Sequence, residues 1–147
     1  MSQKNSILIF VFLALLLPLS LVAHPVKRVN GDVAYSAFST PSGYIQYSES
    51  ATKTTIVGKW NDGFVDGDWA NYKILIVKTT APATILYDLT PLFKGPPAVL
   101  TQNGGTEGWR FDITGHFLRT WNKQTMIVKH NGVTLGSATI NGLWVGA

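Results

Sequence analysis

Cysteine is absent from this sequence of 147 residues. The absence excludes disulfides, thiol catalysis, zinc fingers and iron–sulfur clusters. In an exported domain it also means that the hydrophobic core must supply the stability without covalent cross-links. Five tryptophans, five tyrosines and seven phenylalanines provide the large apolar side chains that such a core needs.

Charge is scarce as well. Twelve basic and eight acidic residues give a formal net charge of +4. The longest basic run is Lys27–Arg28, so the sequence lacks the clustered positive charge of a nucleic-acid groove and predicts no nucleic-acid partner. The small positive excess favours weak attraction to anionic surfaces.

Motifs of several catalytic and metal-binding classes are also missing. No Gly-x-Ser-x-Gly nucleophile elbow occurs, and no two carboxylates suggest the facing pair that glycoside hydrolysis requires. Asp62, Asp66 and Asp68 form an oxygen-rich stretch, but the later Glu of an EF-hand is not at the required spacing. We therefore assign these aspartates to turns rather than to a calcium site.

Residues 1–23 have the layout of a secretory signal peptide. Lys4 precedes the unbroken apolar run Ile7–Leu17, and the small residue Ala23 follows at a position suited to cleavage. The run is shorter than the roughly 20 residues that span a bilayer. We expect a secreted, extracellular protein whose mature chain, His24–Ala147, is one domain with no membrane span.

Short runs of β-branched and aromatic residues, separated by Gly, Pro, Asn and Asp, follow this leader. Turn signals about every 8–12 residues are typical of an all-β sandwich or barrel. Two turns, Asn61-Asp62-Gly63 and Asn131-Gly132, carry hairpin signals because these residues tolerate positive φ. The expected strands are Val29–Ser36 (with a turn at its start), Tyr44–Ser48, Lys53–Trp60, Tyr72–Val77, Ala83–Leu89, Trp109–Ile113, Gln124–Lys129 and Val133–Ile140.

Glycines and alternating apolar residues recur in three stretches: Pro41–Tyr47 (PSGYIQY), Ile56–Val77 (IVGKWNDGFVDGDWANYKILIV) and Lys123–Gly136 (KQTMIVKHNGVTLG). Taken in order, these stretches resemble the copper/zinc superoxide dismutase family and the related secreted CHRD-type domains. The match lies in the glycines, the alternating apolar residues and their spacing. The resemblance implies an all-β, Greek-key sandwich or barrel of about seven to eight antiparallel strands.

The same resemblance implies that the metal centres of the family have been lost. The positions that match its His-x-His copper ligands are Tyr72 and Ile74, and the late ligand position falls on Lys129, with His130 one residue further. The zinc-binding loop has no counterpart, because Thr79–Gly108 contains no histidine. A shared scaffold does not imply a shared reaction.

We therefore expect a secreted, non-catalytic binding or interaction protein that needs no cofactor. Its partner would lie outside the cell, at a cell wall or a host surface. A rival interpretation keeps copper: His24, as a new N-terminus, could chelate the ion through its α-amine and its ring, with His116 or His130 as the third donor. Such a centre would support a dismutase-type redox reaction.

A third interpretation is carbohydrate binding through exposed tryptophan rings. Packing is the more common use of tryptophan, and we assign most of the five indoles to the core. Trp69 and Trp121 stand beside polar residues and are the two expected to be exposed for stacking on sugar rings.

Overall fold

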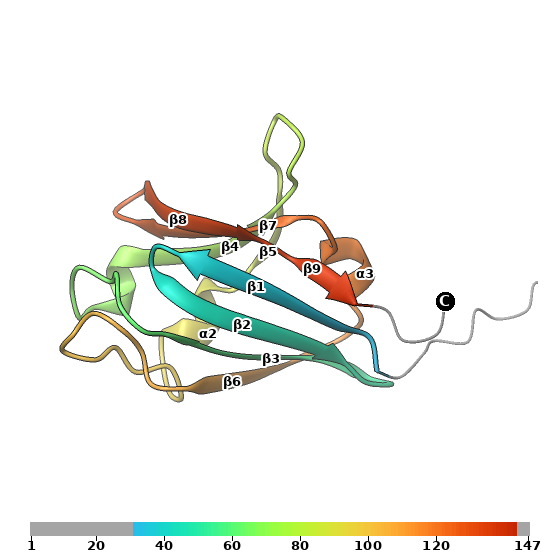
Figure 1. The fold of residues 1–147 in the computed structure, drawn as a ribbon, viewed down its shortest axis with the longest axis horizontal. Coiled ribbons are helices and arrows are strands. Elements are labelled where there is room, and N and C mark those ends of the chain that lie inside the picture. Colours follow the sequence, from blue (N-terminus) through green and yellow to red (C-terminus); the bar gives the residue numbers. More distant parts are fainter. Residues whose placement is uncertain (1–30, 144–147) are drawn as a thin grey trace, which may run out of the picture.

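The structure is a computed structural model in which residues 31–143 are described (Figure 1). The expected signal peptide (1–23), His24 and Trp144 lie outside these residues. The described chain is all-β, as the sequence predicts.

The described residues contain nine strands and three short helical turns. None of these helical turns has the length and apolarity needed to cross a bilayer. In chain order the elements are β1 (Val33–Ser39), β2 (Ser42–Glu49), β3 (Lys53–Trp60), η2 (Trp69–Asn71), β4 (Tyr72–Val77), β5 (Ile85–Asp88), α2 (Thr90–Phe93), β6 (Trp109–Thr114), α3 (Leu118–Trp121), β7 (Thr125–His130), β8 (Val133–Thr139) and β9 (Asn141–Leu143).

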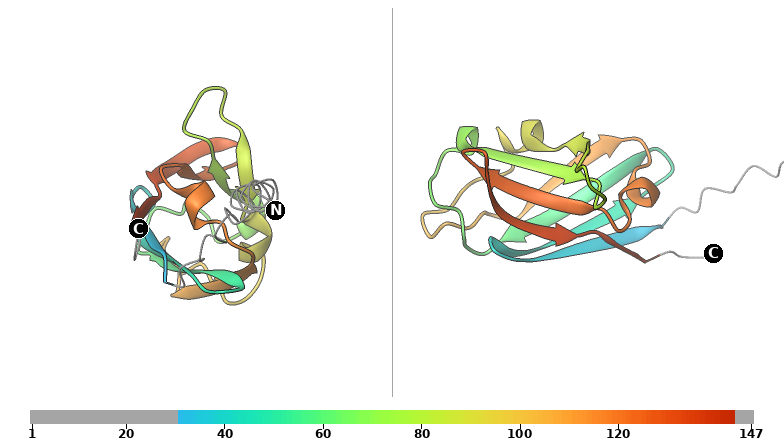
Figure 2. Two further views of the ribbon diagram at one scale, coloured as in Figure 1. Left: turned by 90° about the vertical axis from the view of Figure 1, so that its right-hand side faces the viewer. Right: turned by 90° about the horizontal axis from the view of Figure 1, so that it is seen from above.

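The strands form two antiparallel sheets that face each other as the layers of a sandwich (Figures 1 and 2). The first sheet has the order β6-β3-β2-β1-β9, and the second has the order β5-β4-β7-β8. β6 pairs with β3, and β7 pairs with β4. In both cases the chain forms at least one strand of the opposite sheet between the two partners. Within the described residues β5 and β6 do not pair with each other, so the sheets do not close into a barrel.

The last strand changes sheets at Ile140. β8 pairs with β7 in the second sheet, and β9 pairs with β1 in the first. Between them the Ile140 N–H donates to the Gln124 carbonyl (2.9 Å), and the Ile140 carbonyl accepts from the Lys123 N–H (2.8 Å). This change of sheet joins the two layers along one side, and β9 raises the strand count above the expected seven to eight.

Side chains at alternate positions of the strands fill the space between the layers. In β6 the side chains of Trp109, Phe111 and Ile113 are buried, whereas the residues between them are exposed, as period-2 geometry requires. The largest fully buried side chains are Trp60, Trp121, Tyr47, Tyr72, Phe93, Ile45, Ile56, Ile74, Ile76, Leu89, Leu118 and Met126. The core thus rests on aromatic and aliphatic packing, as a cysteine-free domain requires.

One of the two expected hairpins is wrong. Asn131-Gly132 does join β7 to β8, with φ angles of 47° and 84°. Asn61-Asp62-Gly63, however, begins a crossover between the layers, because β3 belongs to the first sheet and β4 to the second. Positive φ serves both purposes (Gly63 has φ 100°), so local turn chemistry does not distinguish a hairpin from the start of a crossover.

Gly136 in β8 provides a test of how closely the layers approach. A Cβ at this position would overlap the carbonyl oxygen of Thr40 in the β1–β2 turn. Gly136→Ala should therefore push strand and turn apart and lower the free energy of unfolding by about 1–3 kcal/mol.

Gly67→Ala is the matched control, since no heavy atom lies within 4 Å of a Cβ there. It should change the free energy of unfolding by less than about 1 kcal/mol. Urea unfolding compares the two variants, and equal stabilities would contradict the tight contact.

Candidate functional site

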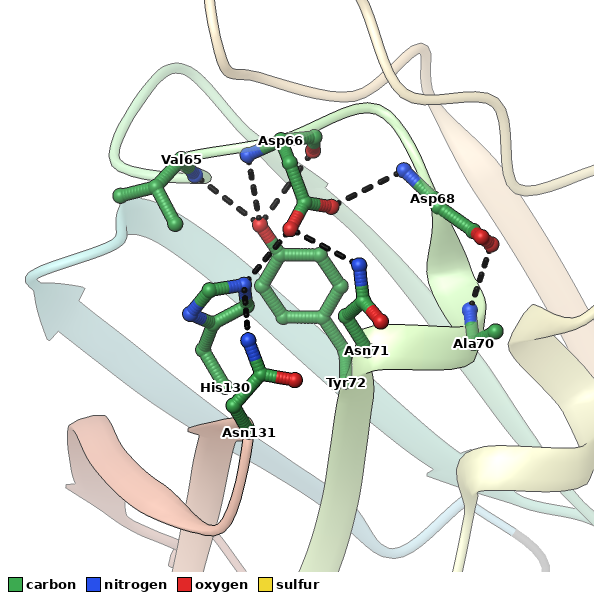
Figure 3. A network of polar contacts seen from close by, with 8 residues as sticks. All are labelled: Val65, Asp66, Asp68, Ala70, Asn71, Tyr72, His130 and Asn131. Atoms are coloured by element: carbon green, nitrogen blue, oxygen red, sulfur yellow. Dashed lines mark hydrogen bonds and ion pairs between the residues drawn. The ribbon is translucent and has the colours of Figure 1, made fainter.

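A polar network holds the crossover loop that connects the two layers before β4 (Figure 3). The Tyr72 ring is 1% exposed, and its hydroxyl accepts hydrogen bonds from the N–H groups of Val65 (2.9 Å) and Asp66 (3.0 Å). The ring anchors the loop to the core while the oxygen satisfies two backbone donors. Tyr72 therefore acts as a structural anchor.

Asp66 joins this network to the end of β7. One carboxylate oxygen lies 2.6 Å from His130 Nε2 and accepts from Asn71 Nδ2 (3.0 Å), and the other accepts from the Asp68 N–H (3.0 Å). The hydrogen bond from His130, followed by that from the Asp68 backbone, lowers the pKa of Asp66 below its ordinary value. Asp68 in turn caps η2 by accepting from the Ala70 N–H. The two carboxylates thus serve the loop, as their assignment to turns predicts.

His116 belongs to a separate network. Its Nδ1 lies 2.7 Å from one carboxylate oxygen of Glu49, whose other oxygen accepts from the Leu118 N–H (3.1 Å) at the start of α3. This network lies at the α3 end of the sandwich, whereas His130 lies at the β7–β8 turn at the opposite end (Figure 1). The two histidines therefore do not share a site, and a copper centre with His24 could use one of them at most. In residues 31–143 no three His, Asp or Glu side chains gather in a metal-binding group.

The side chains that the sequence resemblance aligns with copper ligands do not fit that metal. Tyr72 and Ile74 are buried in the core, and the Tyr72 hydroxyl is already bonded to backbone groups. Lys129, opposite Lys73 in the β4–β7 ladder, offers an ammonium group rather than a lone pair. His130 faces Tyr72 instead, with ring centroids 4.9 Å apart.

Trp69 is partly buried rather than displayed. Its ring contacts Phe64 and Phe93 at centroid distances of 5.3 and 5.2 Å, and its Nε1–H donates to the Ala98 carbonyl (2.9 Å). The indole holds the 98–100 segment onto the aromatic core. It therefore does not offer the free face that sugar stacking needs.

The expectation that Trp121 is exposed is wrong, because its ring is only 1% exposed. Helix α3 lies across one end of the sandwich (Figure 2), so its indole packs against Phe117 at 5.1 Å, Tyr87 at 5.4 Å and Tyr47 at 6.3 Å. Polar sequence neighbours mark the exposed side of this turn, and the indole occupies the other side.

The structure displays other aromatic rings, on the outward face of the first sheet. Tyr44 of β2 is 52% exposed, and Tyr35 of β1 lies beside it with ring centroids 6.1 Å apart and planes only 16° from parallel. In the ladder Tyr35 is opposite Gln46 and Tyr44 is opposite Lys59, so all four side chains share this face.

A pocket of about 270 Å³, partly open to solvent, adjoins the same face. It is lined by Lys59, Asn61, Thr101, Asn103 and Thr106. The Thr106 hydroxyl accepts from the Trp60 N–H (3.0 Å), which fixes the floor of the pocket. The side chains of Lys59 and Asn61 are exposed and make no hydrogen bond to another residue of the described chain, so they are available to a ligand.

The acid on this face is already paired. Asp112 of β6 lies 2.6 Å from Lys53 Nζ, accepts from the Thr55 hydroxyl at 2.6 Å and lies 3.5 Å from Arg110. The hydrogen bonds from Lys53 and then Thr55 lower the pKa of Asp112 from 3.8 to about 2. Its charge is therefore neutralised locally, and Lys59 keeps its own positive charge free.

The sequence does not identify the residues of this face as candidate binding residues: Tyr35, Tyr44, Lys59 and Asn61. The available signal is the alternation along Tyr44–Ser48 and Lys53–Trp60. With Trp60 and Ile45 assigned to the core, the neighbours Lys59 and Tyr44 must point outward.

No protein-family model matches the sequence, and no curated protein matches it. The functional assignment therefore rests on the residues themselves.

Tyr72→Phe tests the anchoring role of the Tyr72 hydroxyl. The variant keeps the ring but leaves the N–H groups of Val65 and Asp66 without their acceptor, so the free energy of unfolding should fall by about 1–2 kcal/mol. Hydrogen exchange at these two amides should accelerate. Tyr44→Phe is the control, because the Tyr44 hydroxyl has no hydrogen-bond partner in residues 31–143; an equal effect of both substitutions would argue against the anchor.

Asp112→Asn tests the charge network on the first sheet. Since the folded-state pKa of about 2 lies below the ordinary value of 3.8, the ionised group stabilises the fold fully above pH 3.8, and this contribution is lost as the pH falls toward 2. The variant should be less stable than wild type at pH 7, and its stability should change less between about pH 4 and pH 2. Denaturant melts across that range measure both effects. Asp62→Asn, at an exposed carboxylate without a described partner, should keep the wild-type pH dependence, and an unchanged slope in Asp112→Asn would contradict the network.

Proposed function

We propose that this chain is a secreted, non-catalytic extracellular binding protein on a superoxide dismutase-like, Greek-key scaffold. The strand order supports the scaffold: β4 and β5 are neighbours, and β7 returns after β6 to lie beside β4. Returning strands of this kind distinguish a Greek key from a simple meander.

The side chains at the matched metal positions support a role without the family's redox centre. Tyr72 and Ile74 belong to the core, and both described histidines are committed to carboxylates, His116 to Glu49 and His130 to Asp66. Each of these bonds uses one ring nitrogen, His116 Nδ1 or His130 Nε2, and ties an end of the sandwich together. These residues therefore favour a structural use.

The observation that carries the binding role is the outward face of the first sheet. The nearly parallel rings of Tyr35 and Tyr44 adjoin a pocket whose Lys59 and Asn61 side chains have no partner in the described chain. Exposed aromatic rings beside convergent polar groups are typical of recognition sites. We call the set Tyr35, Tyr44, Gln46, Lys59 and Asn61 the first-sheet site.

Retention of the secreted protein on insoluble extracellular matrix or cell-wall material tests this role. Wild type should be retained, and the double variant Tyr35→Ala/Tyr44→Ala should bind about tenfold more weakly or worse, because it removes the exposed Tyr44 ring and the Tyr35 ring stacked beside it. The matched control is Ile85→Ala/Val133→Ala, which removes two exposed apolar side chains from the second sheet and should leave retention unchanged. Lack of retention of wild type, or full retention of the tyrosine variant, would contradict the proposal.

Copper-dependent enzyme activity would contradict the proposal that the protein is non-catalytic. The material that is secreted would first be checked by intact mass for a chain that starts at His24. Superoxide dismutase activity that requires added copper, and that disappears in His116→Ala/His130→Ala, would replace the binding role with the redox alternative. A stoichiometric copper titration of wild type serves as an independent readout, since the double variant also loses two histidine–carboxylate contacts that tie the ends of the sandwich together.

A further inference from the structure

We propose that the ligand of the first-sheet site is an acidic polysaccharide, which stacks a sugar ring on Tyr44 and Tyr35 and places a carboxylate at Lys59. This inference rests on the binding function proposed above and adds the chemical class of the ligand. It follows from three properties of the site: its aromatic surface, the polar groups of its pocket and its charge.

The aromatic surface fits the apolar face of a sugar ring. The Tyr35 and Tyr44 rings are 16° from parallel, lie diagonally across two paired strands and form a stacked pair on this face. The C–H groups on one side of a pyranose ring carry partial positive charge and match the negative faces of aromatic rings. Because Tyr44 is 52% exposed, its ring is accessible without any rearrangement of the core.

The pocket fits the hydroxyl groups and the charge of such a sugar. Its lining residues are Lys59, Asn61, Asn103, Thr101 and Thr106. The Thr101 and Thr106 hydroxyls already bond to Asn103 and to the Trp60 N–H, so the Lys59 ammonium and the Asn61 carboxamide are the groups most available to a ligand. Amides and hydroxyls both donate and accept, as sugar hydroxyls do. No carboxylate lines this pocket, so the Lys59 ammonium is matched best by an anionic oxygen of the ligand.

The position of Lys59 links the two parts of the site. Lys59 and Tyr44 are direct partners in the β2–β3 ladder, and the Cα atoms of such partners lie about 5 Å apart. A ligand that stacks on Tyr44 therefore reaches the ammonium within the same or the next sugar unit. A polymer that runs across β1, β2 and β3 would contact the rings and the pocket at once.

The charge of the surrounding sheet favours an acidic polymer over a neutral one. On this face Asp112 is neutralised by Lys53 and Arg110, which leaves Lys59 as an uncompensated positive charge. Asp62 and Glu107 are exposed neighbours of the pocket residues in sequence but do not line the pocket. Basic residues still outnumber acidic ones in the chain after the expected signal peptide, which adds long-range attraction to a polyanion.

The test compares polygalacturonate with the same polymer after chemical reduction of its carboxyl groups to alcohols. The two probes share backbone and linkage and differ only in charge. Affinity electrophoresis and calorimetry with the full secreted protein should show binding to polygalacturonate that weakens as salt is added, and at least about tenfold weaker binding to the reduced polymer.

Two substitutions locate the site. Tyr44→Ala and Lys59→Gln should each weaken polygalacturonate binding about tenfold, and Lys59→Gln should also reduce its dependence on salt. Lys73→Gln is the matched control, because Lys73 is exposed on the outward face of the second sheet; it should weaken binding less than about twofold. Unfolding midpoints equal to wild type would show that the variants are folded.

The remaining outcomes overturn the inference in distinguishable ways. Equal binding of the charged and the reduced polymer, still lost in Tyr44→Ala, would exclude the acidic ligand but keep the binding role. An equal loss of polygalacturonate binding in Lys59→Gln and Lys73→Gln would show that binding depends on general charge attraction and not on the first-sheet site. If neither polymer binds while matrix retention persists, only the ligand class is wrong; if retention is absent too, the proposed function also fails.

Discussion

Burial of the Trp60 indole between the two sheets fixes the end of the sandwich at which the candidate site lies. The ring is fully buried and contacts Phe38, Phe64, Phe93 and Trp109 at centroid distances of 5.2–6.0 Å. These four residues come from β1, the crossover loop, α2 and β6, so one side chain joins strands of the first sheet to the segments that connect the layers. Aromatic pairs in such geometries stabilise a core beyond the area that they bury, which matters in a chain without disulfides.

The same residue positions the polar groups outside. Successive side chains of a strand point to opposite faces, so an inward Trp60 turns Lys59 outward. The Trp60 backbone also exchanges hydrogen bonds with Thr106, through the hydroxyl at 3.0 Å and the Thr106 N–H at 2.7 Å. These bonds hold the loop that carries Thr101 and Asn103 against the end of β3. The pocket between this loop and β3 is therefore a consequence of core packing.

The sequence predicts the strands well because short runs of β-branched and aromatic residues between turn residues are a local property. Lys53–Trp60 and Tyr72–Val77 are found with the expected bounds. Pairing is not local: nothing in the sequence of β6 indicates β3 as its neighbour, and Asn61-Asp62-Gly63 has the same turn chemistry whether the chain folds back or crosses over. The predicted exposure of Trp121 is wrong for a related reason: Tyr47 and Tyr87, which cover its ring, come from strands that are distant in the sequence. The site residues Tyr44 and Lys59 become recognisable only when the outward face is known to be one continuous surface.

A site on the middle strands of a sheet differs physically from one on loops. β2 is paired with β1 and β3, so the backbone beneath Tyr44 is held by neighbouring strands on both sides. Lys59 is paired with Tyr44, and the next residue, Trp60, is hydrogen-bonded to Thr106. A ligand then orders few backbone dihedrals, and the entropic cost of binding is confined largely to the Lys59 side chain. Conversely, the two carboxylate–histidine pairs lie at the ends of the sandwich, where chain segments need ties. The histidines thus tie chain segments together, while the lysine and amide side chains of Lys59 and Asn61, beside the first sheet, have no partner in the described residues.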